Sequence, residues 1–230
     1  MKKTSPAYIL VFMIAICAVF GTGIASVHYA TLDMLIKNEK LHKNRTICRA
    51  FNLPVAEASA DAFQKAIDDN ITYEQITYQG RTWDVYKRKD TGNIGFIFSG
   101  TGFWDRISGI IVLSADLSKI VNIQFLDHKE TPGLGARIEE AWFTDQFKGV
   151  LIAWEQPVDK RIIVGPAPIP GAKNRVDAVT GATQTSIALM KFLNSELETF
   201  RKAIKEWKNM QSHKSEYRNP KQILISNERN

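Results

Sequence analysis

The sequence predicts an α+β fold, an antiparallel sheet with packed helices, preceded by one N-terminal transmembrane helix. Three observations support this class. An uncharged apolar run covers residues 7–30, strand-like segments follow one another between residues 82 and 126, and helical patterns flank those segments. The chain has 230 residues with ordinary hydrophobic and charged shares, 44% and 23%, so we expect one folded domain with appendages.

The apolar run over residues 7–30 contains no Asp, Glu, Lys or Arg. A helix rises 1.5 Å per residue and about 20 residues cross the hydrocarbon core of a bilayer, so the run predicts a retained single-span anchor. A cleaved signal peptide is the alternative, because the small residues Ala25, Ser26 and Ala30 suit a cleavage site. Basic residues flank the run on both sides, so the positive-inside rule does not fix its orientation.

Alternating apolar residues, separated by turns such as the hairpin expected at residues 115–119, predict the sheet. The predicted strands cover residues 82–88, 94–98, 108–114, 120–126 and 161–164. Apolar residues at helical spacing predict the helices. These cover residues 34–49, 56–69, 136–147 and 183–207. In the third helix, Ile138, Trp142 and Phe147 are the expected core positions.

We divide the chain into an N-terminal flank, a transmembrane anchor, a helical stalk, a folded domain and a basic tail. Their ranges are 1–6, 7–30, 31–55, 56–207 and 208–230. Residues 201–230 hold eight Lys and Arg against three Asp and Glu, which is most of the formal net charge of +6. The remaining body is near neutral, which argues against a nucleic-acid-binding protein. The two cysteines and four histidines form no cluster, so no metal site is predicted.

The stretch over residues 177–186, DAVTGATQTS, lies between a Pro/Gly-rich loop and the last predicted helix, which begins near Thr183. The first turn of a helix has unpaired N–H groups that hold an anion such as a phosphate, and a threonine oxygen there could also be esterified to one. The alternative interpretation is that Thr183 is an ordinary N-cap. Asp177 is expected to fix the turn by hydrogen-bonding its backbone N–H groups. Lys173 and Arg175 either neutralise a phosphate or belong to a solvated basic loop.

Asp177, Thr180, Gly181, Ala182 and Thr183 together resemble the flavinylation motif of the FMN-binding domain family. This family includes the NqrC component of the sodium-pumping NADH:quinone oxidoreductase and the RnfG component of the Rnf complex. The resemblance implies that Thr183 carries FMN covalently through a phosphoester, installed by a separate flavin transferase that uses FAD. It also implies that the aspartate helps the transferase to recognise its target.

A second signature, residues 130–135 (ETPGLG), resembles another part of the same family. That loop lies close to the flavin in the family, which implies that Glu130 and Thr131 contact the isoalloxazine or the ribityl chain. Gly133, Leu134 and Gly135 complete the implied binding site, although turn geometry alone also explains the glycines.

Residues 99–105 (SGTGFWD) look like the segment that enters the sheet in this family. Two glycines spaced by one residue are a weak phosphate signal, and no helix follows as a dinucleotide fingerprint requires. Two interpretations stay open, a tight loop with a packed Trp104 and a loop near the flavin.

The resemblance implies a membrane-anchored flavoprotein subunit that relays electrons through FMN in a respiratory ion-translocating complex. The implied partners are other membrane subunits, the lipid bilayer and the flavin transferase. The FMN domain would lie on the periplasmic or extracellular side of the cytoplasmic membrane. We expect no catalytic residue and no complete reaction in this chain alone. The alternatives are a stand-alone extracytoplasmic FMN-binding reductase and a non-redox anchored binding module in which Thr183 is only an N-cap.

Overall fold

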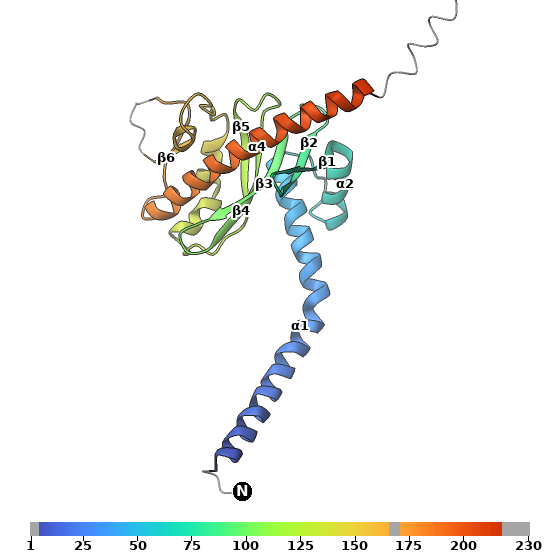
Figure 1. Cartoon of the computed structure of the whole chain (residues 1–230), viewed down its shortest axis with the longest axis vertical. Coiled ribbons are helices and arrows are strands. Elements are labelled where there is room, and N and C mark those ends of the chain that lie inside the picture. The colour runs from blue at the N-terminus through green and yellow to red at the C-terminus, as the bar shows by residue number, and fades with distance from the viewer. Residues whose placement is uncertain (1–4, 166–170, 218–230) are drawn as a thin grey trace, which may run out of the picture. The chain divides into compact units, whose positions relative to one another are not determined.

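The computed structural model describes residues 5–165 and 171–217 (Figure 1). The chain divides into two compact units, Met1–Lys43 and Asn44–Asn230. Helix α1, Pro6–Ala50, makes up nearly all of the described part of the first unit, and its last turns belong to the second. The predicted α+β class is confirmed, because a long apolar N-terminal helix precedes a five-stranded antiparallel sheet with packed helices.

Helix α1 has 45 residues and contains a stretch that is long and apolar enough to cross a membrane. The side chains of Val19, Phe20 and Ile24 are exposed, an arrangement that is unfavourable in water and favourable in lipid. Within the described residues no other helix meets the same criterion. A single-pass anchor therefore fits this unit, and the anchor and the helix predicted over residues 34–49 form one element.

Five consecutive strands form a meander in which each strand pairs antiparallel with the next. They are β1 (Ile71–Tyr78), β2 (Arg81–Arg88), β3 (Ile94–Thr101), β4 (Arg106–Leu113) and β5 (Ile120–Asp127). The last four were predicted, and so was the β4–β5 hairpin. Strand β1 was not predicted, although it pairs with β2 so that Ile76 faces Trp83 and both side chains are buried.

Helix α4, Thr183–Tyr217, lies across the sheet and contacts β1 and β3 (Figure 1). Leu193, Leu197 and Phe200 are fully buried on its inner side. The ring of Phe200 stacks on the ring of Phe96 from β3, with 3.8 Å between the centroids. An apolar stripe at helical spacing thus covers one face of the sheet, and the position of α4 on that face determines where its first residue, Thr183, lies.

Besides the helix that merges into α1, three predicted helices differ from the observed ones. Helix α4 ends at Tyr217 rather than at residue 207, so residues 208–217 of the predicted tail are helical, and residues 218–230 lie outside the described part of the chain. Helix α2, Ala60–Asn70, begins at Ala60 rather than at residue 56, because the Ser59 hydroxyl accepts the Ala62 N–H and caps the helix there. The helix predicted over residues 136–147 is three short pieces, namely η1 (Gly135–Glu139), α3 (Ala141–Thr144) and η2 (Asp145–Phe147).

The interruption between these short pieces changes which side chains reach the core. Ile138 and Phe147 are fully buried as predicted, but Trp142 is 39% exposed and Phe143 is buried in its place. The backbone at Glu140 is extended, which ends η1 and turns the following residues through a new angle. A continuous helix could not have buried Ile138, Phe143 and Phe147 together. Residues three or four apart share a face of a helix, but Ile138 and Phe147 are nine apart and would lie on opposite faces.

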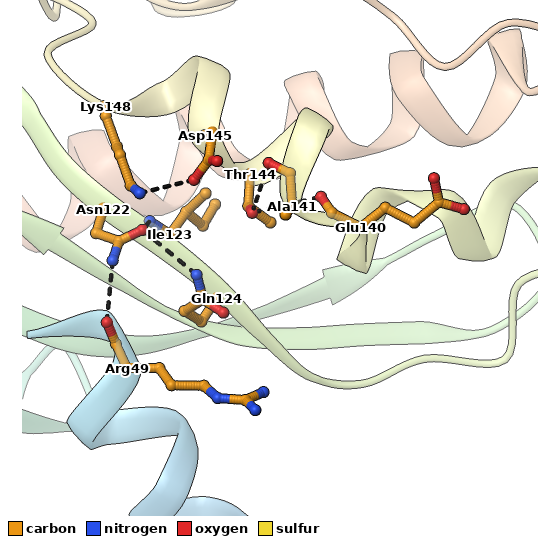
Figure 2. A network of polar contacts seen from close by, with 9 residues as sticks. All are labelled: Arg49, Asn122, Ile123, Gln124, Glu140, Ala141, Thr144, Asp145 and Lys148. Carbon is orange, nitrogen blue, oxygen red and sulfur yellow. Dashed lines mark hydrogen bonds and ion pairs between the residues drawn. The ribbon is translucent and has the colours of Figure 1, made fainter. Parts of the chain in front are cut away.

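A buried polar side chain on β5 joins the last turn of α1 to the sheet. Asn122 is 1% exposed, and its Nδ2 donates to the Arg49 carbonyl at 3.1 Å (Figure 2). Its Oδ1 accepts the Ile123 N–H at 2.9 Å. The Arg49 carbonyl lies at a helix C-terminus, where the last four carbonyls lack partners within the helix. It accepts the Asn52 N–H at 3.2 Å, and Asn122 adds a second bond that ties this end to the sheet. Ile47 and Cys48 are buried beside it.

A two-stranded parallel pair, β6 (Ile163–Val164) and β7 (Arg175–Val176), leads into α4. The predicted strand over residues 161–164 is thus present in shorter form. Asn194 ties the start of β6 to α4, because its amide donates to the Ile162 carbonyl at 2.8 Å and accepts the Ile162 N–H at 3.0 Å. These bonds hold the residue before β6, and β6 in turn pairs with β7, the strand directly before the stretch at residues 177–186.

Candidate functional site

Thr183 is the first residue of α4, and its side chain is exposed. The first helical bond runs from the Ser186 N–H to the Ala182 carbonyl at 3.0 Å. Among the described residues, the Thr183 hydroxyl has no hydrogen-bond partner, and the N–H groups of Thr183, Gln184 and Thr185 have no acceptor. Thr183 therefore does not cap the helix. Its oxygen is free at a helix start whose own donors are free as well.

The turn before Thr183 is held from inside the protein. Ser186 is 1% exposed, and its hydroxyl accepts the Val179 N–H at 3.1 Å. The Ala182 N–H donates to the Val179 carbonyl at 3.0 Å. Gly181 closes the turn at φ +81°, a conformation that costs residues with a Cβ roughly 1–2 kcal/mol. Thr180 is exposed on the outside of the turn.

Asp177 and the basic residues before it lie outside this turn. The Asp177 carboxylate is exposed and forms an ion pair with Arg175, and its N–H donates to the Gln146 side chain at 2.9 Å. Within the described part of the chain, the Asp177 carboxylate accepts no backbone N–H of the turn, so the expected bonds are not formed. Arg175 also donates to the Gly165 carbonyl at 2.9 Å, so its guanidinium is engaged away from Thr183, and Lys173 is exposed.

Three chain segments meet around Thr183 and line an open cavity of about 320 Å³. The segments are the loop after β3, the loop after β5 and the start of α4. The lining residues are Phe103, Trp104, Glu130, Thr131, Leu134, Gly135, Gly181, Ala182, Thr183, Gln184 and Thr185. Seven of the ten residues predicted for the site are among them. Asp177, Thr180 and Gly133 are not, and Gly133 serves the turn geometry at φ +73°.

An aromatic wall, Phe103 and Trp104, forms one side of the cavity. The two side chains are 52% and 66% exposed, and their ring centroids lie 5.1 Å apart in an edge-to-face arrangement. Residues 102–105 do form a tight loop, which joins Thr101 of β3 to Arg106 of β4, but Trp104 is exposed rather than packed. Leu134, 45% exposed, adds a further apolar contact surface to the cavity. The sequence signal for this wall was adjacent aromatic residues directly after a glycine.

Glu130 lies beneath the aromatic wall and is 4% exposed. Its Oε1 accepts the Phe103 N–H at 2.8 Å and the Trp104 N–H at 3.2 Å. Its Oε2 accepts the Thr185 hydroxyl at 2.7 Å. Both carboxylate oxygens are thus engaged by the chain itself, whereas Thr131 is exposed. Sequence reasoning did not find Thr185, whose partner lies 55 residues away along the chain.

Residues 102–198 match the family model described as the FMN-binding domain. The chain is 32% identical over 136 residues to NqrC of the Na(+)-translocating NADH-quinone reductase of Vibrio alginolyticus, which covers 56% of this chain and 52% of that protein. It is 32% identical over 111 residues to the protein of the same name from Yersinia pestis, which covers 46% and 41%. The chain thus spans about half the length of the curated relatives it matches.

Two solved structures share the fold. The corresponding Na(+)-translocating NADH-quinone reductase component from Parabacteroides distasonis aligns with a TM-score of 0.60 at 22% identity, and it covers 74% of this chain and 94% of that chain. The Shewanella oneidensis NqrC structure aligns with a TM-score of 0.60 at 19% identity, covering 75% and 99%. The stretch that matches the family model contains all three segments of the cavity, from Phe103 through Glu130 to the first turns of α4. Over residues 102–198, the chain is therefore similar to the FMN-binding domain family.

Proposed function

We propose that this chain is a membrane-anchored flavoprotein subunit that relays electrons through FMN attached to Thr183 by a phosphoester. The observation that carries the proposal is the Thr183 hydroxyl, exposed and without a partner among the described residues, at the edge of a cavity with an open aromatic wall. The complex would be of the sodium-translocating NADH:quinone reductase kind, because the Vibrio and Yersinia relatives are NqrC proteins of that enzyme.

The residues present fit FMN at both of its ends. The free N–H groups at the start of α4 and the positive end of the helix dipole favour a phosphate beside Thr183. The exposed faces of Phe103 and Trp104, with Leu134 also in the lining, offer apolar surface to a flat aromatic ring system. We infer from this that Gly181 and Ala182 let the chain approach the phosphate closely, while Thr131 and Gln184 are the available polar contacts.

Attachment requires a flavin transferase and FAD. The Thr183 oxygen forms a bond to the phosphorus of the FMN half, the pyrophosphate bond breaks, AMP leaves and the hydroxyl proton is released. The bound FMN supplies the redox chemistry, and the protein supplies its position and surroundings. A covalent link keeps the cofactor on the protein in every redox state.

We propose further that α1 anchors the domain to the cytoplasmic membrane and that the FMN domain lies on its periplasmic or extracellular side. Other membrane subunits would donate and accept the electrons. A tethered carrier on a single helix suits such a relay, because the anchor keeps it among its partners. The domain boundaries proposed for this arrangement are residues 7–30 for the anchor and 56–207 for the FMN-binding domain.

The test is the intact mass of the full chain, co-produced with a flavin transferase and purified in detergent. We expect the mass of one FMN less one water, and peptide sequencing should place it on Thr183. Thr183→Ala should abolish the addition, while Thr183→Ser should keep it. Thr91→Ala is the control and should keep the addition, since Thr91 carries another exposed hydroxyl and lies outside both the motif and the cavity lining. Retention of FMN in Thr183→Ala, or its absence from the unaltered chain, would overturn the proposal.

A further inference from the structure

The loop after β3 that carries the aromatic wall has few bonds of its own. Within it, the Gly102 N–H donates to the Asp105 carbonyl at 2.7 Å. The side chains of Phe103 and Trp104 are largely exposed, so little packing holds them. The two backbone bonds to Glu130 Oε1 are therefore the main link between this loop and the rest of the site.

Glu130 reaches a second segment through its other oxygen. Thr185 lies in the first turn of α4 and is 3% exposed, and its hydroxyl donates to Oε2 at 2.7 Å. Thr185 follows Thr183 by two residues, on the opposite side of the helix. One carboxylate thus bridges the aromatic wall and the helix start that bears the free hydroxyl.

The surrounding backbone is shaped to admit this carboxylate. A Cβ at Gly102 would collide with Glu130 Oε1. A Cβ at Gly135 would lie 2.6 Å from Thr185 Oγ1 and 2.8 Å from Glu130 Oε2, closer than van der Waals contact. A side chain at either glycine would therefore displace the bridge. The described ion pairs include none to Glu130, so its partners are two backbone N–H groups and one hydroxyl.

We infer that Glu130 is a positioning residue, which sets the distance between the aromatic wall and Thr183, and that it is not a direct contact of the flavin. The inference rests on the proposed function for the identity of the cofactor. The bridge itself is a property of the chain before any cofactor is attached. Each of its oxygens already has a partner on a different segment, so the carboxylate acts as a cross-link between them.

Glu130→Gln and Glu130→Ala distinguish a positioning role of Glu130 from a role through its charge or through contact with the flavin. In Glu130→Gln, the amide oxygen can still accept both N–H groups, and the amide nitrogen can donate to the Thr185 hydroxyl, which accepts as well as donates. In Glu130→Ala, all three bonds are lost. Thr185→Val removes only the bond to α4, and Thr185→Ser restores the hydroxyl.

The first measurement is hydrogen exchange at the Phe103 and Trp104 amides, by fragment-resolved mass spectrometry on the full chain without FMN. We expect exchange about tenfold or more faster in Glu130→Ala, and close to the unaltered rate in Glu130→Gln. Thr185→Val should fall between these two and Thr185→Ser should match the unaltered chain. Unchanged exchange in both Glu130→Ala and Thr185→Val would overturn the inference.

The second measurement is the yield of FMN on Thr183 after co-production with the transferase. Glu130→Ala should lower the yield, and Glu130→Gln should restore it. If Glu130→Gln fails as badly as Glu130→Ala, the carboxylate acts through its charge or through a flavin contact, and the positioning role is wrong. Should Glu130→Ala not fold, Thr185→Val and Glu130→Gln decide the question alone. Absence of FMN from the unaltered chain would defeat the proposed function, while the exchange data would still test the bridge.

Discussion

Arg81 and Glu196 form a two-pronged ion pair that joins β2 to α4. The distances are 2.5 Å from Arg81 Nη1 to Glu196 Oε1 and 2.6 Å from Nη2 to Oε2. The Glu196 side chain is 8% exposed and the Arg81 side chain is 42% exposed. The guanidinium also lies 4.7 Å from the centroid of the Trp83 ring. Two parallel bonds between planar groups define orientation as well as distance, so this pair fixes the rotation of α4 on the sheet.

Replacing Arg81 with Ala should destabilise the fold by about 2 kcal/mol, because a buried carboxylate loses its counter-charge. The matched control is Arg137→Ala. Arg137 pairs with Glu140 at 3.2 Å and lies 5.2 Å from the Trp142 ring centroid, but both partners are substantially exposed. That substitution should cost less than about 1 kcal/mol. Urea unfolding of the full chain in detergent measures both, and equal costs would contradict the distinction.

Trp104→Ala should leave the stability of the protein nearly unchanged, since the side chain is 66% exposed. If Trp104 stacks on the flavin as proposed, the variant loaded with FMN should show brighter flavin fluorescence in its folded state. Stacked indoles quench flavins, and unfolding should remove the difference. Trp142→Ala is the control, because Trp142 is also partly exposed and does not line the cavity. Equal fluorescence in both variants and the unaltered chain would count against stacking.

The turn between β4 and β5 makes stability depend on acid. Asp116 has its pKa lowered from 3.8 to about 2, by the Ser114 hydroxyl first and then by the Ser118 N–H and hydroxyl. A carboxyl whose folded pKa lies below its unfolded pKa stabilises the protein above the unfolded value and loses that contribution as the pH falls. The stability difference between the unaltered chain and Asp116→Ala should therefore be constant above about pH 5 and shrink toward about pH 2. Unfolding of both proteins across this range measures it, and a difference that grows with acid would refute the assignment.

Cys48 should resist thiol reagents while the protein is folded. Burial raises the pKa of its thiol to about 11, so the reactive thiolate is scarce at neutral pH. In a Cys17→Ser background, which leaves Cys48 as the sole cysteine, labelling at about pH 8 should be slow in the folded protein and complete after unfolding. Rapid labelling without denaturant would show that the end of α1 opens.

The strands were predictable where apolar residues alternate with polar ones or follow one another without a break. Strand β4 buries nearly every residue from Ile107 to Leu113, and its continuous run of apolar residues predicted it. Strand β1 buries only Ile71 and Ile76, which are five residues apart, so no period of two was visible. The neighbouring strand β2 and the helices α2 and α4 provide the contacts that hold β1 in the sheet.

The site was predictable as separate segments but not as an assembly. The two signatures pointed to Glu130 and Thr183, and the structure brings both into the lining of one cavity. The partners of Glu130 were not visible, because they depend on contacts between residues tens of positions apart in the chain. The exposure of Trp104 could not be predicted either, because the sequence does not show whether an aromatic residue in a loop packs against the core or faces solvent.

The stacking of Phe200 on Phe96 links the cavity to a distant part of the core. At 1.5 Å per residue, α4 carries Thr183 about 25 Å from that ring pair. A straight helix transmits axial displacement along its whole length, so a smaller side chain at Phe200 that let the helix slide would move the threonine out of register with the loops facing it. If a variant altered only at Phe200 lost its cofactor, the cause would therefore be the displacement of α4 and not a lost contact with the cofactor.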